Sequence, residues 1–94
     1  MATELIKNLA RHVGGEVTIQ GWLYNVRSSG KIRFLIVRDG SGMVQGVMVK
    51  QEVGDELFEL ANTLTQESSL KLTGVVREEP RSIGGFELQV TGLE

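Results

Sequence analysis

Between residues 16 and 50 the chain holds three segments in which apolar and polar side chains alternate, joined by two short turns. Val17, Ile19 and Leu23 mark the first segment, and alternation of this kind indicates a β-strand, because successive strand residues face opposite sides. A turn at 28–31 leads into a second strand, 32–39, and the turn 39–42 leads into a third, 43–50. Glycine in both turns tolerates the positive φ of tight hairpins. The pattern predicts an antiparallel meander of three strands.

The periodicity becomes helical on both sides of this meander. A short helix is expected at 3–13, with Thr3 as its N-cap and Gly14-Gly15 at its end. An amphipathic helix of about ten residues is expected from Val53 onward. Its apolar side would carry Leu57, Phe58, Ala61 and Leu64, with Asp55, Glu56 and Glu59 outward. Two further strands are expected at 70–77 and 86–90, separated by a loop at 78–85.

This order of elements predicts an all-β fold. We expect a five-stranded β-barrel of the OB-fold type, with a short N-terminal helix and a helix between strands three and four. A ubiquitin-like or SH3-like domain is the competing interpretation. Gly21 inside the first strand favours the OB-fold, because so small a barrel needs a strand that bends between its two halves. At 94 residues, the chain is expected to form one domain, residues 1–94.

Composition excludes several functional classes. Cysteine is absent and His12 is the single histidine, so a disulfide scaffold, a thiolate metal site and a multi-histidine site are excluded. No apolar run reaches the roughly 18 residues of a membrane span, and no signal peptide is recognisable. We therefore expect a soluble, cytosolic protein. No phosphate-binding glycine motif and no nucleophile–base set is present, so no catalytic residue is expected in this chain.

The net charge of −2 is unevenly distributed. Residues 20–50 carry five basic side chains and one acidic one, a sum of +4, whereas residues 51–70 carry five acidic side chains and no basic one, a sum of −5. This asymmetry indicates one positive and one negative face, or equally the ordinary solvated faces of strands and a helix.

The basic stretch surrounds an aromatic residue, Phe34, which is interleaved with Arg27, Lys31, Arg33 and Arg38. OB-folds bind single-stranded nucleic acid with such a combination, because bases stack on the ring and phosphates meet the cations. If Leu35 and Val37 face the core, Phe34 lies on the outer face. The alternative is that Phe34 belongs to the core and the cations form a solvated rim.

Three more polar or aromatic residues near this stretch have two interpretations each. Gln45 could offer a donor and an acceptor to a base, or could simply face solvent. Trp22 could stack on a base, although packing beside the bend at Gly21 is the favoured interpretation. Asp39 is expected to form its turn rather than to act as an acid.

The segment GWLYNVRSSGKIRFLIVRDGSGMVQGVM, residues 21–48, resembles the N-terminal anticodon-binding domain of class IIb aminoacyl-tRNA synthetases, the subclass of asparaginyl, aspartyl and lysyl enzymes. Within this subclass, the chain resembles the asparaginyl enzymes in residues 27–32, 38–40 and 85–90. The resemblance extends over about residues 6–93. The matching positions are Gly21-Trp22, Arg27, Gly30-Lys31-Ile32, Phe34-Leu35, Arg38-Asp39, Gly42 and Gln45.

The resemblance implies an OB-fold that reads a tRNA anticodon with a central uridine. Phe34 would stack on this base, while Arg27 and Gln45 would form hydrogen bonds with it. Glu78 would contact the first anticodon base, with Glu79 or Arg81 as alternatives. The expected partner is tRNA, with the asparagine tRNA as the expected species.

The catalytic domain of such synthetases has no counterpart in these residues, so we expect an excised fragment or a free-standing paralogue that does not aminoacylate tRNA by itself. No cofactor is expected in this chain, and ATP and magnesium are implied only for the catalytic domain. The isolated domain is expected to be a monomer and the parent enzyme a homodimer. Two other functions stay open: a general single-stranded nucleic-acid-binding module and a protein-interaction module that uses the same face.

Overall fold

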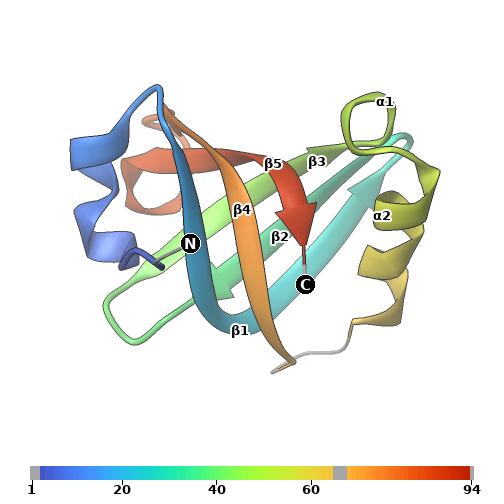
Figure 1. Ribbon diagram of the computed structural model, residues 1–94, viewed down its shortest axis with the longest axis horizontal. Helices are drawn as coiled ribbons and strands as arrows, with labels where there is room; N and C mark the ends of the chain where they lie inside the picture. Colours follow the sequence, from blue (N-terminus) through green and yellow to red (C-terminus); the bar gives the residue numbers. More distant parts are fainter. Residues whose placement is uncertain (1–2, 65–67, 94) are drawn as a thin grey trace.

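The computed structural model describes residues 3–64 and 68–93, and these residues contain a closed β-barrel. Around the barrel the strands follow the order β1–β2–β3–β5–β4, and β4 closes it by pairing with β1 (Figure 1). All neighbours are antiparallel except β3 and β5, which run parallel. The predicted five-stranded all-β barrel is confirmed. The strands are β1 (Glu16–Ser29), β2 (Ile32–Arg38), β3 (Met43–Val49), β4 (Ser69–Glu78) and β5 (Phe86–Leu93).

The first strand belongs to both halves of the barrel. Its first part pairs with β4 and its second part with β2, and Trp22 takes part in both pairings. Gly21 precedes the change of partner, and a Cβ atom there would lie 2.2 Å from the backbone oxygen of Arg38. The backbones can approach this closely only because glycine has no side chain. The bend predicted at Gly21 therefore lies where the barrel closes.

Helical segments cover the two ends of the barrel (Figure 1). At one end, η1 (Ile6–His12) buries Ile6 and Leu9. At the other end, α1 (Lys50–Val53) is followed by α2 (Asp55–Leu60) and η2 (Ala61–Thr63), which bury Phe58 and Ala61. A further short turn, η3 (Ile83–Gly85), lies between β4 and β5. The fully buried interior consists mainly of strand residues: Ile19, Leu23, Leu35, Val37, Val44, Met48, Leu72, Val76, Leu88 and Val90.

The N-terminal helix differs from its prediction. It is a 3-10 helix that begins at Ile6, so the prediction of Thr3 as N-cap is wrong. Its first amide groups are satisfied from another part of the chain instead: the Ile6 N–H donates to Asp39 Oδ2 at 2.8 Å, and the Lys7 N–H donates to Ser41 Oγ at 3.1 Å. The β2–β3 turn therefore caps η1, a contact between distant segments that local spacing does not reveal.

Asp39 also holds its own turn together. Its Oδ1 accepts hydrogen bonds from the Ser41 amide at 2.8 Å, the Ser41 hydroxyl at 2.7 Å and the Gly42 amide at 3.2 Å. Burial would raise the pKa of Asp39, but the hydrogen bonds from Ser41, Ile6 and Gly42 outweigh it and lower this pKa below its ordinary value. The interpretation of Asp39 as a turn former agrees with these contacts.

The helix between β3 and β4 is present as predicted, but it is interrupted. Gly54 adopts a φ of 87° and separates the single turn of α1 from α2. The predicted faces of α2 agree with the structure, because Phe58 is buried while Asp55, Glu56 and Glu59 are exposed.

Replacing Gly21 with alanine should destabilise the barrel, because the new Cβ atom would collide with the Arg38 carbonyl group where the strand changes partner. We expect a loss of about 2–3 kcal/mol in the free energy of unfolding, measured by urea denaturation. Gly92→Ala is the matched control in β5, because a Cβ atom there would lie 3.5 Å from Thr73 Cβ, an ordinary contact. A loss of equal size in both variants would contradict the assignment of a special role to Gly21.

Replacing Asp39 with alanine should remove both the turn and the η1 cap, at a cost of about 2 kcal/mol at neutral pH. The pKa of Asp39 is lower in the folded protein than in the unfolded chain, so its contribution is complete above the unfolded value of about 3.8. The contribution disappears as the pH falls through the folded pKa. The stability difference between the wild type and Asp39→Ala should therefore shrink below about pH 4, and thermal melting between pH 2 and 7 measures it.

Glu4 is present in the wild type and in Asp39→Ala, so its titration affects the stability curves of both proteins. Hydrogen bonds from the Asn8 side chain, the Leu5 amide and His12 lower the pKa of Glu4 to about 2. A difference that stays constant across the acid range would contradict the role given to the Asp39 carboxylate.

Candidate nucleic-acid interface

The outer surface of β1, β2 and β3 carries the residues with which a base could be bound. In β2, Leu35 and Val37 are completely buried, so Phe34, Ile36 and Arg38 lie on the opposite, outward side. Phe34 is half-buried and Arg38 is exposed. The expected orientation of β2 is thus observed, and Phe34 does not belong to the barrel interior.

An irregularity in β1 brings Arg27 to the same surface. Leu23 faces the interior, so regular alternation would turn Arg27 inward as well. The pairing with β2 shifts between Leu23 and Asn25, however, which inserts one extra residue into β1. The β-bulge reverses the phase of the strand, and Arg27 becomes the exposed cross-strand partner of Phe34.

Arg27 and Phe34 are in direct contact. The guanidinium carbon of Arg27 lies 5.3 Å from the centroid of the Phe34 ring, within the range of a cation–π interaction. On the other side of Phe34, its cross-strand partner in β3 is Val47. The pair therefore combines an aromatic surface with a cationic group that can donate several hydrogen bonds.

Gln45 lies in the next row of the same surface. It pairs with Ile36 of β2 on one side and with Glu87 of β5 on the other, two residues along β3 from Val47. Its side chain is half-buried. Diagonal neighbours across strands lie about 7–8 Å apart, so a group held against Phe34 is within reach of the Gln45 amide.

Next to Gln45 lies a charged pair that was not predicted from the sequence. Glu87 is buried, forms an ion pair with Arg77 of β4 and accepts a hydrogen bond from the Ser82 hydroxyl at 3.1 Å. The sequence could have indicated this pair, because Glu87 is an acidic residue between Phe86 and Leu88 in a predicted strand. Glu78, the residue expected to contact the first anticodon base, is exposed and is the last residue of β4, one position beyond Arg77.

Arg33 lies on the other side of β2. Its Nε donates to the Phe58 carbonyl group at 3.1 Å, and its Nη1 donates to Ser28 Oγ at 2.6 Å. Its guanidinium carbon is 4.2 Å from the centroid of the Phe58 ring. Arg33 thus links β2 to α2 at the end of the barrel and does not accompany Arg27 and Phe34.

Lys31 is exposed in the turn between β1 and β2. Its backbone oxygen accepts a hydrogen bond from the Lys50 amide at 2.9 Å, so α1 begins beside this turn. The exposed Lys31 side chain adds positive charge at the tip of the β1–β2 hairpin.

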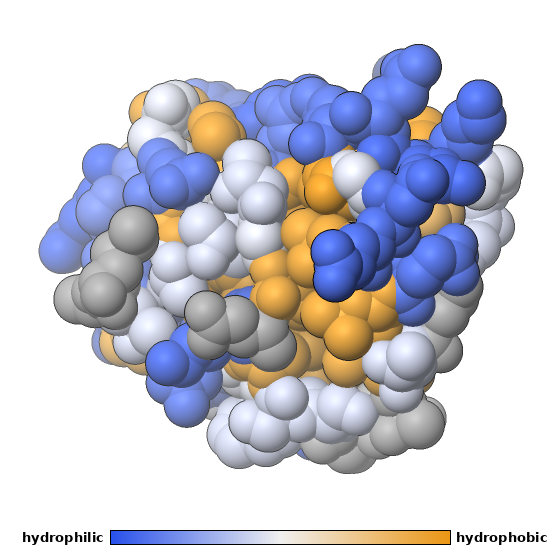
Figure 2. Space-filling model, turned by 45° about the vertical axis from the view of Figure 1, so that its right-hand side comes forward, coloured by the Kyte–Doolittle hydropathy of each residue, from blue (hydrophilic) through white to orange (hydrophobic). Residues whose placement is uncertain are grey.

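The helical end of the barrel has a different chemical character. Figure 2 turns the α1–α2 side forward and shows an apolar area bordered by hydrophilic residues. A hollow of about 520 Å³ lies there, lined by Leu57, Leu60 and Val53 together with Glu56, Glu59 and Thr63. Acidic and aliphatic side chains offer neither positive charge nor an aromatic surface to a nucleic acid, so the β1–β3 surface is the better candidate.

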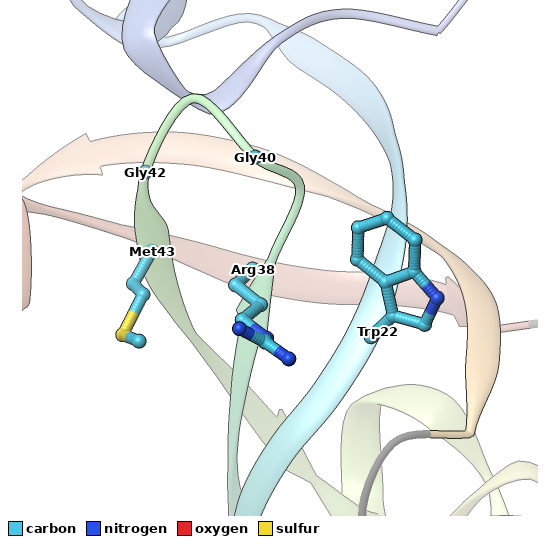
Figure 3. A pocket seen from close by; sticks show the side chains of 5 residues that line it. All are labelled: Trp22, Arg38, Gly40, Gly42 and Met43. Carbon is cyan, nitrogen blue, oxygen red and sulfur yellow. The ribbon is translucent and has the colours of Figure 1, made fainter.

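A second hollow opens on the β1–β3 surface itself. It has a volume of about 420 Å³ and is lined by Trp22, Arg38, Met43, Gly40 and Gly42. Figure 3 shows the side chains of Trp22, Arg38 and Met43 side by side, from three neighbouring strands, next to the turn with the two glycines. The Trp22 side chain is 44% exposed, so packing explains only part of its role.

Two features are absent from the part of the chain that the structure describes. Within the ranges 3–64 and 68–93, no three His, Cys, Asp or Glu side chains gather closely enough to hold a metal ion. Among the helices of these ranges, none is long and apolar enough to cross a membrane.

Residues 17–94 match the tRNA anti-codon family model, which is described as "OB-fold nucleic acid binding domain". The asparagine–tRNA ligase of Desulforamulus reducens is 68% identical over 94 residues, which are all of this chain and 22% of the ligase. The chain therefore spans about a fifth of the length of this relative.

Solved structures agree with this relationship. Asparaginyl-tRNA synthetase from Pyrococcus horikoshii, complexed with asparaginyl-adenylate, matches with a TM-score of 0.93 and 37% identity, over 100% of this chain and 22% of the synthetase. An OBody bound to hen egg-white lysozyme matches with a TM-score of 0.85 and 21% identity, over 99% of this chain and 92% of the OBody, which shows a shared fold. The resemblance to asparaginyl anticodon-binding domains stated from residues 21–48 is confirmed.

The two arginines should differ in their contribution to stability. Arg33→Gln should lower the free energy of unfolding by about 2–3 kcal/mol, because it removes the charged hydrogen bonds to the Phe58 carbonyl group and to Ser28 together with the contact with the Phe58 ring. Arg27→Gln, the matched control on the exposed surface, loses only the contact with the Phe34 ring and should change it by no more than about 0.5–1 kcal/mol. Chemical denaturation of both variants tests this, and equal losses would contradict the separate placement of the two side chains.

Proposed function

The chain belongs to the family of OB-fold nucleic acid binding domains that the tRNA anticodon model describes, and on this premise we propose that it is the anticodon-reading module of an asparagine–tRNA ligase. The observation that carries this proposal is the convergence of Arg27, Phe34 and Gln45 on one outward surface. An aromatic ring, a cation and an amide are the groups with which OB-folds bind splayed single-stranded bases. The high identity to asparagine–tRNA ligases along the whole chain supports the choice of parent enzyme.

In this proposal the central uridine of the anticodon stacks on Phe34. Arg27, already beside the ring, donates to a carbonyl oxygen of the base. Gln45 donates and accepts along the edge of the same base, because its amide carries both kinds of group. Cytosine presents an amino group where uracil has a carbonyl oxygen, so this set of contacts discriminates between the two bases.

The remaining residues take supporting roles in the proposal. Lys31, at the tip of the β1–β2 hairpin, meets a phosphate of the loop, and Glu78, beside the β4–β5 loop, contacts the first anticodon base. Arg33 supports these contacts indirectly, because its bonds to Ser28 and Phe58 fix the end of the hairpin. The chemistry of amino-acid activation, with ATP and magnesium, belongs to the remainder of the parent ligase and uses none of these residues.

The proposal is tested first by removing the stacking ring. Phe34→Leu should weaken binding of an anticodon stem-loop with the sequence GUU by about 1–3 kcal/mol, measured by fluorescence anisotropy at low salt. Phe34→Tyr is the matched control, because it retains the ring and should bind within about twofold of the wild type.

The fold should survive this change, because Phe34 lies outside the fully buried interior. Thermal melting of Phe34→Leu verifies this. If the folded Phe34→Leu variant binds the stem-loop as tightly as the wild type, the ring does not stack on a base and the proposal fails.

A second candidate function is sequence-tolerant binding of single-stranded RNA. It is favoured by the aromatic and cationic character of the surface alone, because stacking and phosphate contacts do not depend on base identity. This function predicts equal affinity for loops with uridine or cytidine at the centre, whereas the proposed function predicts a preference for uridine.

A further inference from the structure

The hollow that contains Trp22 lies on the same outward surface as Phe34. Trp22 pairs with Arg38, and Arg38 pairs with Met43, so the three side chains form one row across β1, β2 and β3. Arg38 and Phe34 are four residues apart on β2, so both face outward and their rows lie about 13 Å apart. The hollow therefore lies on the same face of the sheet as the residues proposed to hold the central base.

An exposed aromatic residue lies between these two rows. Tyr24 falls at the β-bulge of β1, next to the row of Ile36 and Gln45, and its side chain is 42% exposed. Phe34, Tyr24 and Trp22 thus present aromatic side chains at successive levels of the surface. An arrangement of this kind suits a single strand whose bases are splayed apart, because stacked bases would lie only about 3.4 Å from one another.

We propose that Trp22 is the stacking platform for a nucleotide that flanks the anticodon triplet, with its base held in the hollow between the indole ring and the Gly40–Gly42 turn. The inference rests on the proposed function, because it extends the same RNA strand along the same surface. The hollow has the chemistry for this occupant: an indole face for the base, the Arg38 guanidinium for a negatively charged backbone, and two glycines that leave space beside the ring.

The hollow on α2 lacks this chemistry. Its lining consists of aliphatic, acidic and threonine side chains, without an aromatic ring or a cation. The RNA path therefore continues from Phe34 toward the β2–β3 turn and not toward the helices.

Trp22 is the only tryptophan of the chain, so its intrinsic fluorescence reports directly on this hollow. We would titrate the wild-type chain with the trinucleotide GUU and with longer RNAs that carry two further nucleotides on the 5′ or on the 3′ side. The trinucleotide should shift the NMR signals of Phe34 without quenching Trp22. One of the extended RNAs should quench the fluorescence and bind at least about fivefold more tightly, the gain expected from one stacked base.

Two controls keep this test independent of protein folding. An extended RNA with abasic sites at the two added positions should bind wild-type protein like the trinucleotide and should not quench Trp22. Trp22→Leu should lose the gain of the extended RNA but retain the affinity for the trinucleotide, and Trp22→Phe should restore much of the gain because it keeps a ring.

The outcomes separate this inference from the proposed function. Phe34 signals that respond to the trinucleotide, combined with no quenching by either extended RNA, would overturn the role of Trp22 and leave the hollow to another class of partner, such as a protein. Phe34 signals that respond to no RNA would overturn the proposed function itself.

Discussion

The structure depends on a single strand that serves two parts of one barrel. β1 pairs with β4 along its first half and with β2 along its second half, and the change of partner requires the close approach of Gly21 to the Arg38 carbonyl group. The irregularity between Leu23 and Asn25 follows immediately. Barrel closure and placement of the outward residues are thus coupled, because the same stretch of backbone that bends to close the barrel also reverses the alternation that would otherwise bury Arg27.

The barrel places its structural residues and the residues proposed to bind RNA on different surfaces. Its interior is filled by aliphatic strand residues, and η1 and α2 seal its ends, which leaves the outward surface of β1–β3 free to carry Phe34, Arg27 and Gln45. The two arginines that flank Phe34 in β1 and β2 illustrate the division. Arg27 lies over the Phe34 ring, whereas Arg33 binds Phe58 at the end of the barrel. Side chains of identical chemistry therefore make different contacts, because they lie on opposite sides of the sheet.

Much of this architecture could be predicted from alternation and turn residues. The strands, the hairpin turns, the bend at Gly21 and the outward position of Phe34 are local properties of residues 16–50. The differences from the prediction arose where distant segments meet: η1 is capped by Asp39 rather than by Thr3, and Glu87 is buried in β5 and paired with Arg77 of β4. The helix is interrupted because Gly54 adopts a positive φ. Every glycine can adopt such a φ, so the sequence alone does not show which one does. The partial exposure of Trp22 was missed for a similar reason, because a Gly-Trp pair at a bend suggests packing.

The central claim is that this surface distinguishes uridine in a single-stranded anticodon. The most direct measurement is an NMR titration of the wild-type chain at low salt with two anticodon stem-loops, GUU and GCU, which differ only in the central base. Shifts of the Arg27, Phe34 and Gln45 signals with the first RNA, and none or much weaker ones with the second, are the predicted result. Equal shifts with both RNAs would contradict uridine reading and leave a general single-strand binder, and the absence of shifts with either would contradict RNA binding at this surface.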